Sequence, residues 1–158
     1  MAEILEALWS GRDGIDAGAA MLMCDIDDFK SLNDHLGHAE GDRCLATVAG
    51  VIAESVRRDF EHVARFGGEE FLVLLPSAEG SYAMAVAERV RLSVERAALP
   101  NPGSYGGGCV TVSIGVAVRT PGDRDVSHEE LQRRADAALY QAKQSGRNRV
   151  ALYGLRVT

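Results

Sequence analysis

Apolar residues along the chain form two kinds of pattern: short runs, and longer stretches with a helical period. Residues 19–26 are a continuous apolar run that stops at acidic residues, which predicts a buried strand. Residues 110–118 alternate and are rich in β-branched side chains, which also predicts a strand. Shorter runs predict strands over residues 62–66, 70–75 and 149–153.

Helical periodicity marks the segments between these runs. In residues 43–57 and 82–98, apolar side chains recur every three or four positions, which predicts helices with one buried face. A further helix is predicted from Ser127, which forms a capping-box pattern with Glu130, to about residue 143. Residues 1–9 are interpreted as a short helix. The two predicted apolar faces consist of Leu45, Ala49, Ile52 and Val56, and of Ala83, Val86, Val90 and Val94.

The order of these elements predicts an α+β fold. The first six match the βαββαβ ferredoxin-like arrangement, and a further helix and strand follow at the C-terminus. Gly67 and Gly68 tolerate positive φ, so the second and third strands are expected to form a β-hairpin. In this arrangement the first strand lies antiparallel beside the third. The topology therefore predicts that Asp25 lies near Glu69, although the two are far apart in sequence.

Composition and charge restrict the class of protein. The chain has 158 residues, 46% hydrophobic and 25% charged, which is typical of one globular domain. Residues 1–18 are interpreted as an N-terminal helix and linker, and residues 19–158 as the main domain. A net charge of -6 disfavours a nucleic-acid partner. Three scattered cysteines favour reduced thiols and a cytoplasmic location.

No apolar run is long enough to span a bilayer, and the N-terminus lacks the pattern of a signal peptide. We therefore expect no membrane contact within these residues. An anchor elsewhere in a longer protein is left open.

Acidic residues cluster where the first predicted strand ends. Asp25, Asp27 and Asp28 can form an ordinary solvated turn, or they can contribute to a magnesium site. Mg²⁺ prefers hard oxygen ligands and usually takes one or two carboxylates together with phosphates and water. Asp25 and the carbonyl of Ile26 would supply two such oxygens. Because strand side chains alternate, Asp27 is expected on the same side as Asp25.

The predicted hairpin carries the sequence RFGGEEF at residues 65–71. A Gly-Gly turn alone is common, but glycines also let a ligand approach the backbone closely. Two acids directly after the turn would repel a triphosphate unless a metal lay between them. Glu69 is therefore interpreted as a metal ligand shared with Asp25.

Four segments, taken in order, resemble the GGDEF domain family of diguanylate cyclases. RFGGEEF resembles GG[D/E]EF, DIDDFKSLND resembles DxDxFKxxND, HAEGD resembles HxxGD, and RADAALYQAKQSGRNRV resembles RADxALYxAKxxGRNRV. Together they cover roughly residues 19–153. The resemblance implies a nucleotide cyclase-like antiparallel sheet flanked by helices. It also implies a homodimer that condenses two GTP molecules into cyclic di-GMP, releases pyrophosphate and uses Mg²⁺ or Mn²⁺.

The resemblance also implies roles for individual residues. Asp25, Glu69 and the Ile26 carbonyl correspond to metal ligands, and Glu70 to a group that binds a second ion or assists deprotonation. Asn33 and Asp42 correspond to a guanine-binding pair, whose donors and acceptors suit that base. Taken alone, a Lys and an Arg four apart are usually a solvated face, and a lone His is as often structural. The implied substrate-binding set is Asp28, Phe29, Lys30, Asn33, His38, Asp42, Gly67, Gly68, Lys143 and Arg147.

The chain departs from the family pattern in three places. An inhibitory product site RxxD becomes Arg58 with Glu61, with Arg89 as a second arginine. Equally, Arg57, Arg58 and Asp59 can be a charged helix end. The usual DxLTxLxNR segment is not found before Ala19, and Phe66 replaces Tyr or Trp. The alternative function is therefore a sensor module that binds GTP or cyclic di-GMP without catalysis. An unrelated ferredoxin-like interaction domain would leave the four motifs unexplained.

Overall fold

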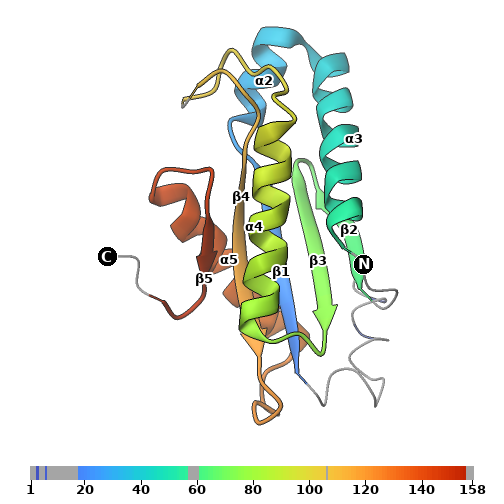
Figure 1. Cartoon of the computed structure of the whole chain (residues 1–158), viewed down its shortest axis with the longest axis vertical. Coiled ribbons are helices and arrows are strands. Elements are labelled where there is room, and N and C mark those ends of the chain that lie inside the picture. Colours follow the sequence, from blue (N-terminus) through green and yellow to red (C-terminus); the bar gives the residue numbers. More distant parts are fainter. Residues whose placement is uncertain (1–2, 4–5, 7–17, 57–60, 106, 156–158) are drawn as a thin grey trace.

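A single five-stranded sheet forms the centre of the protein (Figure 1). The computed structural model describes residues 3, 6, 18–56, 61–105 and 107–155. The strands lie in the order β2-β3-β1-β4-β5. Their bounds are β1 Ala19–Ile26, β2 His62–Gly67, β3 Glu70–Pro76, β4 Val112–Arg119 and β5 Val150–Leu152.

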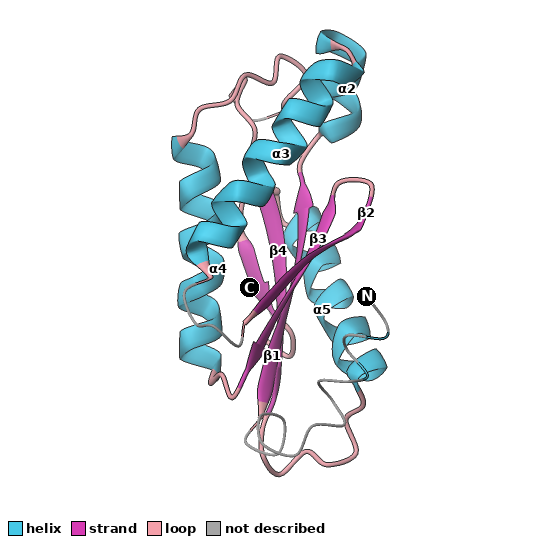
Figure 2. Ribbon diagram, turned by 90° about the vertical axis from the view of Figure 1, so that its right-hand side faces the viewer, coloured by secondary structure: helices cyan, strands magenta, loops and turns pink. Residues whose placement is uncertain are grey.

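Helices cover both faces of this sheet (Figure 2). Alternate residues of β1 point to opposite faces, as the period of a strand requires. Leu22 and Cys24 join the core beneath α3 and α4, whereas Met21 and Met23 join a second core beneath α5. The helices are α2 Phe29–Leu36, α3 His38–Ser55, α4 Gly80–Arg96 and α5 His128–Gln144.

The sheet has the predicted topology. β1 is antiparallel to both β3 and β4, and β2 is antiparallel to β3, which is the ferredoxin-like arrangement. β5 extends the sheet by pairing parallel to β4. The bounds of β1 agree with the sequence prediction, and β2, β3, β4 and β5 each differ from it by one or two residues. The α+β prediction is confirmed.

Two helical predictions were incomplete. Residues 29–36 form the helix α2, which the pattern of apolar residues does not predict. Its only fully buried side chain is Leu32, so its apolar periodicity is too weak to recognise. α3 begins at His38 rather than at residue 43. The prediction began too late because the first turn of this helix is largely polar. The predicted helix over residues 1–9 lies outside the described residues apart from Glu3 and Glu6, and the boundary at residue 18 stays a prediction.

α5 packs directly against β4. A Cβ at Gly115 would lie 2.1 Å from the carbonyl oxygen of Ala135 and 2.2 Å from the amide nitrogen of Leu139, so only glycine permits this approach. The helix begins where predicted, since the Ser127 hydroxyl accepts a hydrogen bond of 3.1 Å from the Glu130 amide. The close approach at Gly115 fixes α5 across the sheet, and it therefore determines where the C-terminal end of this helix lies.

The cysteines and the helix lengths bear on the predictions about thiols and membrane spans. All three cysteines are free. Within the described part of the chain, no helix combines the length and the apolarity that a membrane span requires.

Candidate active site

The acids of the first strand and of the hairpin meet at one edge of the sheet. Asp25 on β1 is paired in register with Glu70 on β3. The amide of Ile26 donates a hydrogen bond of 3.3 Å to the carbonyl oxygen of Glu69. The predicted adjacency of the first strand and the hairpin turn is therefore confirmed at the level of the backbone.

Burial and nearby carboxylates raise the pKa values of two acids at this edge. Burial raises the pKa of Asp25; Lys143 opposes that increase, and Glu69 and Asp27 add to it. The pKa of Glu70 is raised by burial and then by the carboxylates of Asp25, Asp136 and Glu69. A cation placed between these groups would relieve their mutual repulsion.

Lys143 joins the two alternating aspartates of β1. Its Nζ lies 2.6 Å from Asp25 Oδ1 and 2.9 Å from Asp27 Oδ1. Both carboxylates therefore face the same side, as the alternation of strand side chains predicts. Burial by itself lowers the pKa of Lys143, but the two carboxylates outweigh that effect and raise it. Lys143 is held as a charged ammonium group at the end of α5.

The oxygen donors at this edge suit a hard divalent cation whose coordination shell is completed by a bound ligand. Among the residues that the structure describes, no three His, Cys, Asp or Glu side chains are arranged as a metal site. Two carboxylates are nevertheless as many as Mg²⁺ usually takes from a protein when phosphates and water supply the rest. Asp25 and Glu69 would supply these carboxylates, and the carbonyl of Ile26 would add a further oxygen.

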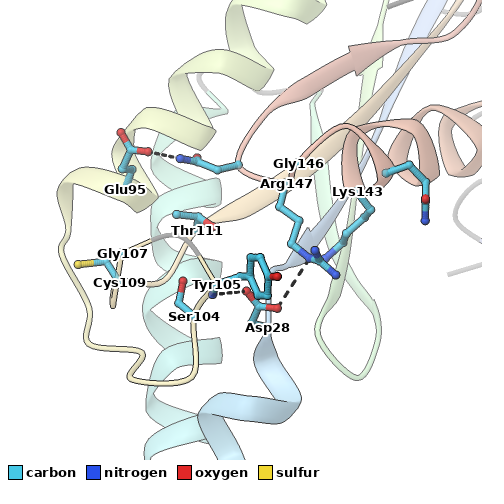
Figure 3. Close-up of a pocket in the computed structure, with 12 residues that line it drawn as sticks. Asp28, Glu95, Ser104, Tyr105, Gly107, Cys109, Thr111, Lys143, Gly146 and Arg147 are labelled. Carbon is cyan, nitrogen blue, oxygen red and sulfur yellow. Dashed lines mark hydrogen bonds and ion pairs between the residues drawn. The ribbon is translucent and has the colours of Figure 1, made fainter.

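A cavity of about 430 Å³ opens beside this edge (Figure 3). Asp28, at the start of α2, stands at its wall with Lys143 and Arg147. Arg147 Nε lies 3.7 Å from Asp28 Oδ1, and the amide of Tyr105 donates to Asp28 Oδ2 at 3.2 Å. Asp28 has φ 53° and makes no side-chain cap to α2. The first amides of α2 therefore lie near two cationic side chains, an arrangement that suits phosphate.

The predicted guanine-binding residues lie on two adjoining helices. Asn33 is on α2, and its Oδ1 is buried without a hydrogen-bond partner among the described residues. Asn33 Oδ1 lies where a Cβ on Gly41 would stand, and Gly41 directly precedes Asp42 on α3. Asp42 and His38 are exposed. A buried amide oxygen that lacks a partner is a group that a bound donor would satisfy.

The hairpin turn leaves room above it. Gly68 has φ 41°, and a Cβ at either Gly67 or Gly68 would meet nothing within 4 Å. Both glycines are exposed, as is Lys30 on α2, whereas Phe29 is partly buried against the core. The turn is open to a ligand, and the role of Lys30 stays a prediction.

The predicted product site is only partly described. Arg58 lies outside the described residues. Glu61 is buried, and both of its carboxylate oxygens accept hydrogen bonds from the Tyr82 hydroxyl, at 2.9 and 3.2 Å. Arg89 donates through Nη2 to the carbonyl of Ser55, and its Nε has no partner within the described ranges. Whether these residues bind product stays a prediction.

Several contacts at this site lie outside the predictions from the sequence. Thr111 and Ser113 donate to Asp27, and the loop containing Asn101 and Tyr105 packs against Asp28. The two hydroxyls lie two positions apart at the start of a β-branched strand. That spacing places them on one face and was the available signal. The contribution of the loop had no comparable signal.

A five-stranded mixed sheet with carboxylates and a Gly-Gly turn at one edge, beside a pocket that Lys143 and Arg147 help to line, defines an α+β domain of the nucleotide cyclase-like type. The chain belongs to the GGDEF domain family: the family model described as "Diguanylate cyclase, GGDEF domain" matches residues 1–149.

Curated relatives agree with this assignment. The chain is 46% identical over 133 residues to diguanylate cyclase A of Treponema denticola, covering 84% of this chain and 34% of that protein. It is 43% identical over 132 residues to the probable diguanylate cyclase DgcT of Escherichia coli, covering 84% of this chain and 28% of that protein. The chain thus spans about a third of the length of these relatives.

Solved structures of the family share the fold. The GGDEF domain of DgcB from Caulobacter crescentus, in complex with c-di-GMP, is 35% identical and superposes with a TM-score of 0.77, covering 98% of this chain and 84% of that one. The active GGEEF domain of a diguanylate cyclase from Vibrio cholerae is 31% identical with a TM-score of 0.74, covering 88% and 85%.

Proposed function

We propose that this domain is a diguanylate cyclase that condenses two GTP molecules into cyclic di-GMP and releases two pyrophosphates. The observation that carries the proposal is the register of β1 and β3, in which Asp25 lies opposite Glu70 and the backbone of Ile26 is bonded to that of Glu69. The curated relatives are named diguanylate cyclases, which supports the same activity here.

The acids have two proposed tasks. Asp25, Glu69 and the carbonyl of Ile26 would hold Mg²⁺ or Mn²⁺. The bound ion would polarise the α-phosphate and lower the pKa of the attacking 3′-hydroxyl. Glu69 or Glu70 accepts the proton of that hydroxyl. The raised pKa of Glu70 suits this role, because a stronger base takes up a proton more readily.

The remaining residues orient the nucleotide. Arg147 and Lys143 stand beside the first amides of α2, from Asp28 and Phe29, where they would bind the triphosphate. The buried Oδ1 of Asn33 and the carboxylate of Asp42 would accept hydrogen bonds from the guanine edge. This set holds the base and the phosphates at separate places, so it fixes the position of the ribose between them.

The reaction requires two copies of the domain. Each 3′-oxygen forms a bond to the α-phosphorus of the other GTP, and each pyrophosphate leaves with its bridging oxygen. One domain is proposed to hold one GTP, so two domains must face each other with antiparallel substrates. A homodimer is therefore the proposed catalytic unit.

The test is incubation with GTP and Mg²⁺ at several protein concentrations, followed by chromatography for cyclic di-GMP. We expect the rate per protein to rise with protein concentration, since the active species is a dimer. Glu69→Ala is expected to abolish the product, and circular dichroism checks that the variant keeps its fold. Retained activity in a folded Glu69→Ala protein would refute the assigned role.

A sensor module is the second candidate function. The altered RxxE sequence favours it. It predicts binding of GTP or cyclic di-GMP with no product at any protein concentration. The same chromatography, combined with calorimetric titration of both nucleotides, distinguishes a sensor from a cyclase.

A further inference from the structure

Asp27 is the most completely bonded carboxylate of the site. Its side chain is only 2% exposed, in contrast to 14% for Asp25. Oδ1 accepts from the Ser113 hydroxyl at 2.7 Å and from Lys143 Nζ at 2.9 Å. Oδ2 accepts from the Thr111 hydroxyl at 2.8 Å and from the backbone amide of Asn148 at 3.0 Å.

These four bonds separate the role of Asp27 from that of Asp25. An ionised carboxylate has about four lone-pair positions, and in Asp27 each oxygen already has two donors. Asp27 is therefore unsuited to be a metal ligand, although it lies on the same side of the strand as Asp25. Its bonds lead instead to β4, to the end of α5 and to the turn that follows α5.

The turn after α5 needs such an anchor. Arg147 and Asn148 have φ of 64° and 47°, in the left-handed region that non-glycine residues seldom adopt. The amide of Asn148 is bonded to Asp27, and its side chain is bonded to Arg91 at 3.0 Å and to Glu95 on α4. Strained backbone of this kind persists only where its surroundings hold it.

Two cationic side chains depend on this anchor. Asp27 bonds directly to the ammonium group of Lys143, and it fixes the residue that follows Arg147. Lys143 and Arg147 both line the cavity beside the start of α2 (Figure 3). Moving the turn would redirect Arg147, and removing the negative charge would release Lys143 from its position between two carboxylates.

We propose that Asp27 is a positioning residue that aims Lys143 and Arg147 at the triphosphate. The inference rests on the proposed function, because it takes the cavity as the phosphate-binding part of the site. Asp27 would contact neither the nucleotide nor the metal, and would act only through the two cations and the turn that carries them.

The test compares two nucleotides that differ in their phosphates. Binding of GMP and of an α,β-methylene analogue of GTP, both with Mg²⁺, is measured by calorimetry for the wild type and for Asp27→Asn. We expect Asp27→Asn to bind the analogue about tenfold more weakly or worse, because hydrogen bonds to charged groups are among the stronger ones. GMP lacks the outer phosphates, so its affinity should change less than twofold.

A matched control is available at the other end of β4. Asp123 also accepts bonds from a threonine hydroxyl and a backbone amide, both of Thr120, at 2.6 and 3.0 Å. Asp123→Asn is the same substitution in a turn remote from the site, and it should leave both affinities unchanged. If Asp27→Asn does not fold, Ser113→Ala loosens the same carboxylate and should lower the analogue affinity by about threefold.

Hydrogen exchange gives a second readout. The amides of residues 146–148 should exchange faster in Asp27→Asn than in the wild type or in Asp123→Asn. An equal loss of affinity for GMP and for the analogue, or no loss of affinity for either, would overturn the positioning role. A wild-type protein that binds neither nucleotide would instead refute the proposed function, which the inference requires.

Discussion

Asp25 on β1 and Glu70 on β3 are direct partners across an antiparallel strand pair, and the pKa of each is raised. Burial is the first cause in both, and repulsion between the carboxylates adds to it. Such an arrangement costs stability in the absence of a cation, and proteins commonly accept that cost at functional sites.

Replacing Glu70 with Gln should stabilise the protein at pH 7. The folded state raises the pKa of Glu70 above its ordinary value of 4.5, so ionisation of this group weakens folding as pH rises through the raised pKa. Gln cannot ionise and avoids this loss. We therefore expect a higher Tm for Glu70→Gln at pH 7, with the difference disappearing below about pH 4.5. Thermal melts between pH 4 and 8 measure it, and a lower Tm at pH 7 would contradict it.

Mg²⁺ with a GTP analogue should raise the Tm of the wild type but not that of Asp25→Asn. At a hundredfold excess over the dissociation constant, binding contributes about 2.7 kcal/mol. For a domain of this size that corresponds to roughly 5–10 °C. Differential scanning calorimetry with and without EDTA checks it, and Asp123→Asn serves as a control that should keep the full shift. An equal shift in Asp25→Asn would remove this carboxylate from the metal site.

Most of the fold could be predicted from the sequence because it follows from strong local patterns. The strand β1 ends where apolar residues give way to Asp25 and Asp27, and α4 carries an uninterrupted apolar stripe. The adjacency of Asp25 and the hairpin followed from topology alone. Helix α2 could not be predicted, because its single buried residue, Leu32, leaves no period to recognise.

The sequence predicts those parts of the site in which a residue type points to one chemistry. It does not predict those parts in which a hydrogen-bond network determines the role of a side chain. The alternation of strand side chains places Asp25 and Asp27 on the same side and does not distinguish them. Only the structure shows that Asp27 is saturated by Ser113, Thr111, Lys143 and the amide of Asn148. The left-handed turn at Arg147 and Asn148 likewise depends on contacts from Asp27 and from two side chains of α4, which no local pattern encodes.

Tyr82→Phe should tighten the binding of cyclic di-GMP. Glu61 is the acid of the predicted product site, and the Tyr82 hydroxyl bonds to both of its oxygens. A ligand that recruits Glu61 must break this contact, which contributes about 1 kcal/mol, or roughly fivefold in affinity. Calorimetric titration of the wild type and Tyr82→Phe measures the change. Equal affinities would show that Tyr82 does not compete with the ligand.

Gly41→Ala should impair nucleotide recognition through Asn33. A Cβ at position 41 would lie 1.8 Å from Asn33 Oδ1, so the amide must move away from the place where we propose that it meets guanine. We expect a loss of stability of about 1–3 kcal/mol from overpacking and a smaller preference for GTP over ATP.

Gly50 lies on the same helix with nothing within 4 Å of its Cβ position. Gly50→Ala should therefore stabilise α3 by up to about 1 kcal/mol and leave the preference unchanged. Chemical denaturation and competition binding with GTP and ATP separate the two effects, because a general loss of stability would weaken both nucleotides equally. An unaltered preference in folded Gly41→Ala would show that Asn33 takes no part in reading the base.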